Sequence, residues 1–449
     1  MTATGRLACA ALALCILATC RGQAPSDPDP VFTSAERAAL EALAPAVLPP
    51  PPADSSNRWA DDPGAALLGQ RFFMDPLFSG RLLDGDNDGS PETLGMKGQT
   101  GRVSCAGCHV PASGFLDDRT ASKQISLASG WNLRRTPSLL DVGQTMLLMW
   151  DGRHDTLYNQ PFGPIENPTE MNSSRLFVAA QIAARYRADY EAVFGPLPDL
   201  SRLPALDAAS TGCDRPLTGT PTCHGMPGDG AEYDGLSAGD QEAVTRMVVN
   251  LGKALGAYQR LLSCGAGRFD RFIHGEATAL SRAEQRGASI FAGKGQCIRC
   301  HSGPYLSDQA FHNVGLRPEG VAGGAFTDSG DRGAAVGLAT ARADPLNASG
   351  RFSDGDDGRL SLPGGDLEGA FRTPTLRCVG MRPSFMHTGQ LRTLEDVVAF
   401  LNRGSPFGGY PGTGELPPLG LTALEQSDLV AFLRALTGPG PAAGLLVSH

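Results

Sequence analysis

The chain has 449 residues, of which 41% are hydrophobic, so it is long enough for about two or three domains with sizeable cores. Its 57 glycines and 34 prolines predict many loops, and its overall composition excludes the fibrous and disordered classes. The formal net charge of −9 argues against nucleic acid as a partner, whereas an acidic surface suits a basic protein partner.

The N-terminus has the pattern of an export signal. Arg6 precedes an apolar run over residues 7–18, which is too short to span a bilayer and is typical of a secretory signal. The sequence Leu17-Ala18-Thr19-Cys20 resembles a bacterial lipobox, so we expect residues 1–19 to be removed and Cys20 to be lipidated. The alternative is an ordinary cleaved signal followed by a soluble protein. Both predict a location in the periplasm or cell envelope, and the first predicts a lipid anchor in a membrane.

Residues 20–58 are predicted to be a Pro-rich linker. The prolines within residues 44–53 favour an extended spacer that lifts the folded body, beginning near Trp59, off the membrane. Apolar spacing then predicts a short helix over residues 67–73.

An acidic loop follows this helix. Asp84, Asp86 and Asp88 match the first half of an EF-hand calcium loop. Gly95 stands at the twelfth position, where such a loop normally has a bidentate glutamate. A calcium site and a solvated acidic loop are therefore both open interpretations.

Two C-x-x-C-H motifs, at residues 105–109 and 297–301, carry the strongest chemical signal. Both thiols can bond a porphyrin edge while the histidine that follows reaches its iron, and this is the attachment pattern of c-type haem. A disulfide, a zinc site or a thioredoxin-like pair would explain the cysteines but not the histidine in both copies. We therefore predict two covalent haems c. The attachment residues are Cys105, Cys108 and His109 in the first motif and Cys297, Cys300 and His301 in the second.

The other cysteines predict disulfides. Of 11 cysteines, three belong to the leader and four to the haem motifs, which leaves an even number in an oxidising compartment. Cys213 and Cys223 flank a short loop and are expected to pair. Cys264 and Cys378 then form the second pair by elimination.

Further helices are expected along the rest of the chain. They are predicted over residues 175–200 with an end at Phe194-Gly195-Pro196, and over residues 241–262, 281–294, 394–402 and 423–436. Residues 201–236 are expected to be an irregular insertion and residues 320–369 a Gly/Asp-rich loop. The predicted fold is all-α and loop-rich, with two cytochrome c-like helical domains over residues 59–265 and 266–440, each carrying one covalent haem.

Three motifs follow the first attachment site in a fixed order: R-x-T-P-S-L at residues 134–139, W-D-G-R at residues 150–153, and Q-x-x-x-P-x-x-N-P-x-E-M at residues 160–171. With C-x-x-C-H they resemble the bacterial di-haem cytochrome c peroxidases and their methylamine-utilisation (MauG-type) relatives, over residues 67–436. The resemblance implies an oxidoreductase that reduces hydrogen peroxide with electrons from a small periplasmic donor, a cytochrome c or a cupredoxin.

The resemblance also implies roles for individual residues. Glu170 would move protons between the peroxide oxygens, Gln160 would be its polar partner, and Pro164 would shape the distal wall. Trp150 would relay electrons between the haems. Without the motif, Glu170 would be a solvent-exposed loop residue and Trp150 a core residue.

Several positions depart from the family. The histidine that blocks the first iron in the peroxidases is replaced by Ile125, so the first haem is expected to be open, as in the MauG type. That favours an alternative in which peroxide is used to oxidise tyrosine or tryptophan of a partner protein. A non-catalytic electron carrier is the second alternative, but it would give Glu170 and Gln160 no purpose.

The second haem lacks its usual sixth ligand, because Leu401 occupies the family position. Met386 is the predicted replacement, and Met381, Tyr410, water or an empty site are the alternatives. The interdomain calcium that the resemblance implies would meet Arg135 and Arg382 at two ligand positions, and a guanidinium there would repel the ion. His312, in a family motif, is expected to be structural.

Overall fold

The computed structural model describes residues 32–120, 126–214, 221–317, 330–356, 358–360, 366–405 and 410–448. The predicted signal peptide, Cys20 and Ile125 lie outside these residues. No helix in the described ranges combines the length and the apolar character that a membrane span requires.

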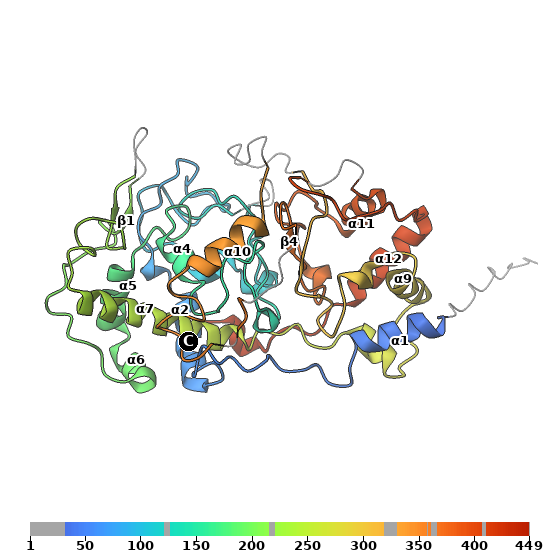
Figure 1. Ribbon diagram of the computed structural model, residues 1–449, viewed down its shortest axis with the longest axis horizontal. Helices are drawn as coiled ribbons and strands as arrows, with labels where there is room; N and C mark the ends of the chain where they lie inside the picture. Colours follow the sequence, from blue (N-terminus) through green and yellow to red (C-terminus); the bar gives the residue numbers. More distant parts are fainter. Residues whose placement is uncertain are drawn as a thin grey trace, which may run out of the picture.

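Helices and loops make up almost all of the described structure (Figure 1). The helices are α1 (Ser34–Leu43), α2 (Pro63–Met74), α3 (Cys105–Cys108), α4 (Phe162–Glu166), α5 (Arg175–Arg185), α6 (Arg187–Phe194), α7 (Ala238–Gln259), α8 (Arg268–Ile273), α9 (Arg282–Ala292), α10 (Ala334–Ala343), α11 (Leu394–Arg403) and α12 (Ala423–Ala435). Two antiparallel pairs of two-residue strands add β1 (Gly212–Cys213) with β2 (Cys223–His224), and β3 (Phe311–His312) with β4 (Phe371–Arg372). The predicted helical, loop-rich fold is thus confirmed.

Local sequence explains where most of the predicted helices start. A serine or threonine caps the first turn of α5, α7, α9, α11 and α12, and in α9, α11 and α12 an acidic residue at the third helical position completes a capping box. The helix predicted over residues 175–200 is interrupted at Tyr186, so that α5 and α6 are separate elements.

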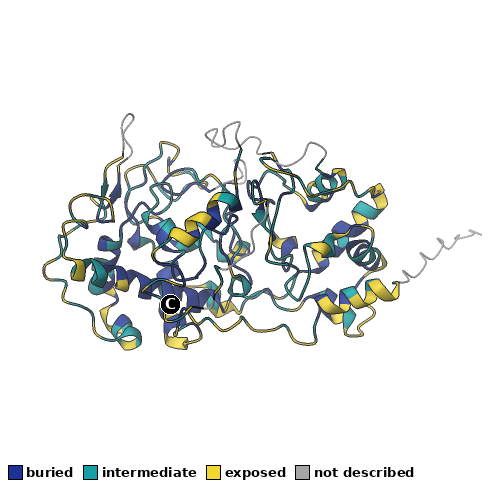
Figure 2. Ribbon diagram, in the orientation of Figure 1, coloured by how far each residue is buried: buried dark blue, intermediate teal, exposed yellow. Residues whose placement is uncertain are grey.

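Buried apolar side chains form two large clusters. The first cluster is built around α2, α5 and α7 and includes Phe73 and Tyr258, and the second is built around α9 and α12 and includes Phe291 and Phe432. Figure 2 shows that α7 is buried along most of its length. Each cluster lies beside one attachment motif, because Cys105 packs against the first and Cys297 against the second.

The two clusters share a packing device. A Cβ at Gly69 of α2 would lie 1.9 Å from the carbonyl oxygen of Ala254 in α7. A Cβ at Gly287 of α9 would lie 2.0 Å from the carbonyl oxygen of Asp428 in α12. In both clusters, the helix that precedes the attachment motif (α2 or α9) therefore crosses a later helix (α7 or α12) at a glycine, where the two backbones are in contact.

The described part of the predicted Pro-rich linker, residues 32–58, packs on the body. Leu40 and Leu43 of α1 are 1% exposed and belong to the second cluster. Beyond α1 the chain crosses to the first cluster, and the Pro49 carbonyl accepts hydrogen bonds from the Tyr305 hydroxyl and the Gln144 amide (2.5 and 3.3 Å). The amphipathic pattern of residues 34–43 gave α1 an apolar face, and burial of that face holds the segment down.

The C-terminal end crosses in the opposite direction. The Tyr258 hydroxyl of α7 donates a hydrogen bond to the Leu445 carbonyl (2.6 Å), and the Gln70 amide of α2 donates to the carbonyls of Gly444 and Val447. The C-terminus accordingly lies beside α2 and α7, while α1 lies beneath α9 and α12 (Figure 1). The N-terminal helix α1 thus packs on the second cluster, which is built from later residues, and the C-terminal residues pack on the first cluster, which is built mainly from earlier ones.

The predicted Gly/Asp-rich loop over residues 320–369 is only partly a loop. It contains α10, and Leu346 and Phe352 after this helix belong to the first cluster. Lys253 of α7 donates to the Phe352 carbonyl (3.0 Å) and forms an ion pair with Asp354 (2.7 Å). A buried lysine needs hydrogen-bond and charge partners, and Lys253 of the first cluster finds them in this segment. This part of the predicted C-terminal domain is therefore held against the first cluster.

Candidate functional site

A cavity of about 780 Å³ lies beside the first attachment motif. Its volume falls in the range typical of enclosed ligand sites. Apolar residues of α2 and α7 line it together with polar residues from the loop that follows Trp150. Among the lining residues are Cys105, Cys108, His109, Phe73, Leu251, Leu255, Arg135, Trp150, Arg153, Gln160, Pro164, Asn167 and Glu170. All four predicted catalytic residues therefore share one cavity with the first motif.

The first motif fits a covalently attached haem. Both thiols are free of disulfides, and burial raises their pKa values to about 12. His109 Nδ1 lies 3.3 Å from the Phe115 carbonyl oxygen, and burial lowers the pKa of the ring to about 4, so the imidazole is neutral at pH 7. A histidine that binds metal commonly fixes its ring by donating the other N–H to a carbonyl. His109 could therefore hold iron through Nε2.

Glu170 is held at the cavity wall by its neighbours. Its Oε1 accepts a hydrogen bond from the Asn167 amide (2.9 Å). Burial raises the pKa of the carboxyl group, and the positive charge of Arg153 acts in the opposite direction. A carboxyl group with a raised pKa can both accept and return a proton near neutral pH.

The other predicted catalytic residues line the same cavity. Trp150 is 8% exposed, and its indole N–H donates to the Arg135 carbonyl (2.7 Å). The Gln160 amide lies 3.5 Å from the Met149 sulfur. Pro164 lies in α4 and Gln160 in the turn just before this helix, and both line the cavity.

The second attachment motif has the same local design. Both thiols are free of disulfides, His301 Nδ1 lies 2.9 Å from the Leu306 carbonyl oxygen, and burial lowers the pKa of the ring to about 4. Met386 packs against the same apolar cluster as Cys297, whereas Met381 is 42% exposed. The sixth ligand stays a prediction, and burial favours Met386 over Met381.

The acidic loop does not form a metal-ligand group. The Asp86 carboxylate accepts a hydrogen bond from the Trp131 indole (2.8 Å), and Asp88 accepts from the backbone N–H of Ser90 (2.9 Å). The single cluster of three such ligands within the described residues is Cys300 with Asp308 and His312, and it includes none of Asp84, Asp86 and Asp88. The predicted calcium site at this loop therefore receives no support from the geometry.

The remaining cysteines and His312 have structural partners. Disulfides join Cys213 to Cys223 and Cys264 to Cys378. The His312 ring lies between the carboxylates of Asp308 and Glu415 (2.8 and 2.7 Å). The hydrogen bond to Asp308, then that to the Cys300 sulfur and that to Glu415, raise its pKa to about 11.

Two residues near Glu170 had no predicted role. Asn167 holds the carboxylate, and the positive charge of Arg153 lowers its pKa against the effect of burial. Both lie inside motifs that the sequence presents, W-D-G-R and N-P-x-E, so motif membership was the available signal. His154 is mostly buried, and its charged form would lower the Glu170 pKa.

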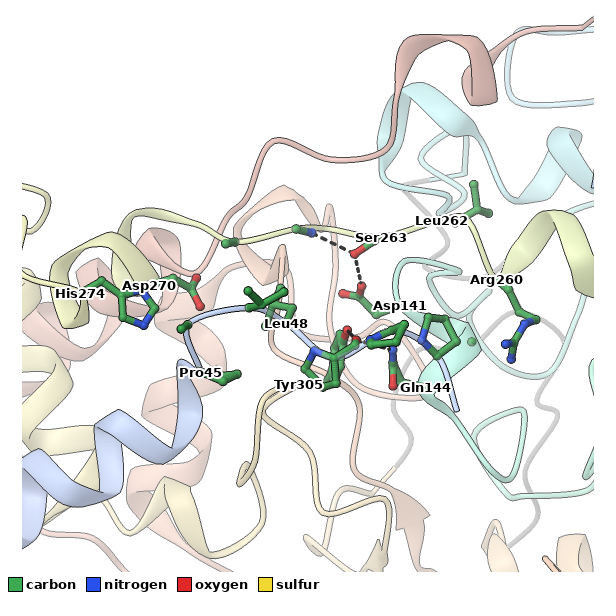
Figure 3. A pocket seen from close by; sticks show the side chains of 18 of the residues that line it. Pro45, Leu48, Asp141, Gln144, Arg260, Leu262, Ser263, Asp270, His274 and Tyr305 are labelled. Carbon is green, nitrogen blue, oxygen red and sulfur yellow. Dashed lines mark hydrogen bonds between the residues drawn. The ribbon is translucent and has the colours of Figure 1, made fainter. Parts of the chain in front are cut away.

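Figure 3 shows a second cavity, of about 500 Å³, beneath the proline-rich segment over residues 45–51. Asp141 lines it and accepts a hydrogen bond from the Ser263 hydroxyl (2.8 Å), and burial raises the pKa of this carboxyl group. None of the predicted catalytic or haem-attachment residues lines this cavity. The predicted catalytic residues thus line the first cavity and not the second.

Comparison with known proteins identifies close relatives in sequence. The model of the family "Di-haem cytochrome c peroxidase" matches residues 63–215. The cytochrome-c peroxidase IdrP1 of Denitromonas iodatirespirans is 30% identical over 419 residues, which cover 92% of this chain and 91% of that protein. The methylamine utilization protein MauG of Methylorubrum extorquens is 28% identical over 421 residues, which cover 93% and 89%.

Solved structures share the fold. The diheme peroxidase BthA of Burkholderia thailandensis matches with a TM-score of 0.57 and 22% identity, covering 88% of this chain and 96% of that one. A MauG-like protein associated with microbial copper homeostasis matches with a TM-score of 0.57 and 24% identity, covering 90% and 96%. From the attachment motifs, the shared cavity and this near end-to-end similarity, the chain belongs to the family of di-haem cytochrome c peroxidases and their MauG-type relatives.

Proposed function

We propose that the protein is a di-haem c-type peroxidase that reduces hydrogen peroxide to water with electrons from a small donor protein, a cytochrome c or a cupredoxin. The observation that carries this proposal is the buried carboxyl group of Glu170 in the cavity of the first attachment motif. Relatives named cytochrome c peroxidase support peroxide as the substrate. The apolar run at residues 7–18 and Cys20 support export and a lipid anchor.

The residues of the first cavity have separable tasks in this proposal. A bound haem supplies the iron at which two electrons reduce peroxide. His109 holds the ring nitrogen toward the iron because the Phe115 carbonyl fixes the imidazole. Glu170 would accept a proton from one peroxide oxygen and deliver it to the other, so that breaking the O–O bond releases that oxygen as water. Two electrons from the donor and two further protons would convert the remaining oxygen to the second water. Gln160 and Pro164 shape the space above, and Asn167 keeps the carboxylate in position.

Electrons enter at the second attachment motif in this proposal. His301 and Met386 are the proposed ligands of its iron, and a methionine ligand would raise the reduction potential. Trp150 then relays electrons toward the first motif. Its buried indole is fixed by the Arg135 carbonyl, which limits the motion that would slow such a relay.

A MauG-type activity is the second candidate. Ile125 replaces the histidine that would block the first iron, and a relative is named MauG. Peroxide-treated protein would then keep its oxidising equivalents until a partner protein supplies tyrosine or tryptophan electrons. Steady peroxide consumption with a reduced small cytochrome would favour the peroxidase, and discharge only by a partner protein would favour the MauG type. Indifference to peroxide would leave an electron carrier.

The Glu170→Gln variant tests the central step. It keeps the size and the Asn167 contact but cannot shuttle a proton, so peroxide turnover should fall by roughly 10²–10⁴-fold while both haems remain attached. Glu191→Gln, a change at a surface glutamate paired with Arg187, is the control and should retain turnover. Stopped-flow kinetics with haem quantification would measure both, and unchanged turnover in Glu170→Gln would refute the proton shuttle.

A further inference from the structure

Arg135 is a buried cation without a complete set of partners. The residue is 3% exposed and lines the cavity of the first attachment motif. One terminal nitrogen, Nη1, donates to the Ser384 carbonyl, whereas Nε and Nη2 are buried and have no hydrogen-bond partner. A guanidinium group in this condition is costly, because two donors are taken from water and left unpaired.

The surroundings of Arg135 add positive charge. Burial, together with the charge of Arg382, lowers the pKa of Arg135 to about 9. Burial also lowers the pKa values of Arg372 and Arg382 to about 10. The charge of Arg382 therefore acts on both Arg135 and Arg372, and like charges repel strongly in a buried environment.

The nearby carboxylates do not balance this charge. Asp117 is engaged by Arg119, which approaches both of its oxygens (3.1 and 2.7 Å). Asp141, the one anion that favours the charged form of Arg382, accepts bonds from Ser263 and Cys264 through Oδ1, and its buried Oδ2 has no hydrogen-bond partner, so it does not pair with these arginines. Arg135 therefore has no carboxylate partner, and its unpaired donors have the fork geometry that suits one.

Arg135 also connects the two halves of the molecule. Its backbone N–H donates to the His387 carbonyl (2.8 Å), its side chain reaches the Ser384 carbonyl, and its own carbonyl accepts from the Trp150 indole (2.7 Å). The guanidinium thus lies where the wall of the first cavity meets the loop over residues 384–387, which packs on the second cluster.

We propose that Arg135, supported by Arg382, binds a carboxylate side chain of haem and supplies the positive charge that an interdomain calcium ion would otherwise provide. The proposal rests on the proposed haem content of the protein. It assigns these arginines a positioning and electrostatic role, because they act on the haem carboxylates and not on the peroxide. A positive charge at this place disfavours the oxidised state of the nearby haem and so raises its reduction potential.

Spectroelectrochemical titration of the holoprotein tests this. In Arg135→Gln, the midpoint potential of at least one haem should fall enough to change its reduced-to-oxidised ratio tenfold at fixed potential, which is about 59 mV for a one-electron couple. In Arg135→Lys, which keeps the charge, the midpoint potential should fall by less. Arg434→Gln removes an equal charge from an exposed pair with Glu395 and should leave both potentials unchanged. Unchanged potentials in Arg135→Gln with both haems attached would overturn the proposal.

If Arg135→Gln does not fold, Arg382→Gln can take its place in the measurement of the potentials, because it leaves the Arg135 bond to Ser384 intact. Two measurements on the unaltered protein also remain. Metal analysis should find no stoichiometric calcium, and EGTA should leave the haem spectrum unchanged; bound calcium whose removal alters the spectrum would overturn the proposal. Titration with inorganic phosphate should not move the potentials. A saturable shift in the unaltered protein would overturn the haem carboxylate as the ligand and assign the site to a free anion. None of these readouts depends on turnover, so they can fail independently of the Glu170 test.

Discussion

His312 is a histidine whose neighbours favour its charged form. Hydrogen bonds from its ring to Asp308, to the Cys300 sulfur and to Glu415, in decreasing order of effect, raise its pKa to about 11, against about 6.5 in an unfolded chain. A group with a raised folded pKa stabilises the protein fully below the unfolded pKa, and this stabilisation is lost as pH rises through the folded pKa.

The His312→Gln variant should therefore be less stable than the unaltered protein at pH 6, and the difference in the free energy of unfolding should shrink as the pH rises above about 6.5. Denaturant titrations over this range measure it. His274→Gln, at an exposed histidine, is the control and should show no such trend. A difference that is independent of pH would contradict the ion-pair account.

Trp150 has two roles: its indole donates a buried hydrogen bond to the Arg135 carbonyl, and it is the proposed electron relay. Trp150→Phe keeps an aromatic ring but leaves the buried Arg135 carbonyl without its donor, so we expect a loss of about 1–3 kcal/mol in the free energy of unfolding. Electron transfer from the second haem to the first should also slow, because phenylalanine is harder to oxidise. Trp131→Phe, which removes an exposed indole bond to Asp86, should change neither by a comparable amount. Equal rates in both variants would remove Trp150 from the relay.

At the scale of elements, the two glycine crossings set how closely helices approach. Gly69→Ala would place a methyl group 1.9 Å from the Ala254 carbonyl oxygen, so α2 and α7 must separate. We expect destabilisation of about 1–3 kcal/mol or more, measured by thermal unfolding. Gly239→Ala, near the start of α7 with its nearest neighbour 3.9 Å away, should be neutral or slightly stabilising. A harmless Gly69→Ala would show that this crossing is not close in solution.

Local patterns predicted most of these elements but not their placement. The capping residues and apolar spacing located α2, α7, α9, α11 and α12 to within a few residues. The division of α5 from α6 at Tyr186 was missed, since this tyrosine turns inward to pack on Phe72 and Phe78 and to donate to Asp75. Such a break depends on partners that are more than a hundred residues away in the chain.

For the whole molecule, the Cys264–Cys378 disulfide closes the longest covalent loop, with a separation of 114 residues, against 10 for Cys213–Cys223. Chain-entropy arguments assign about 5 kcal/mol to the longer loop and about 3 kcal/mol to the shorter one. Replacing both cysteines of the longer loop by serine should therefore lower the melting temperature more than the same change in the shorter loop. Calorimetry of the two double variants compares them, and the reverse order would contradict this ranking.

The crossing ends of the chain could not be predicted from composition. Prolines over residues 44–53 indicate an extended segment equally well whether it is free or packed. Only the buried leucines of α1 and the hydrogen bonds to Pro49 distinguish the two cases, because they join residues from both clusters.

By itself the sequence determined the chemistry of this protein: two haem-attachment motifs, the residue types around the first one, the helical class and the family they resemble. These follow from residues that lie within a few turns of one another, where spacing dictates geometry. The tertiary structure alone decided that Arg135 is buried with unpaired donors, that Asn167 and Arg153 flank Glu170, and that the two ends of the chain exchange sides. Burial and charge compensation arise only when distant segments meet, and no local pattern records them.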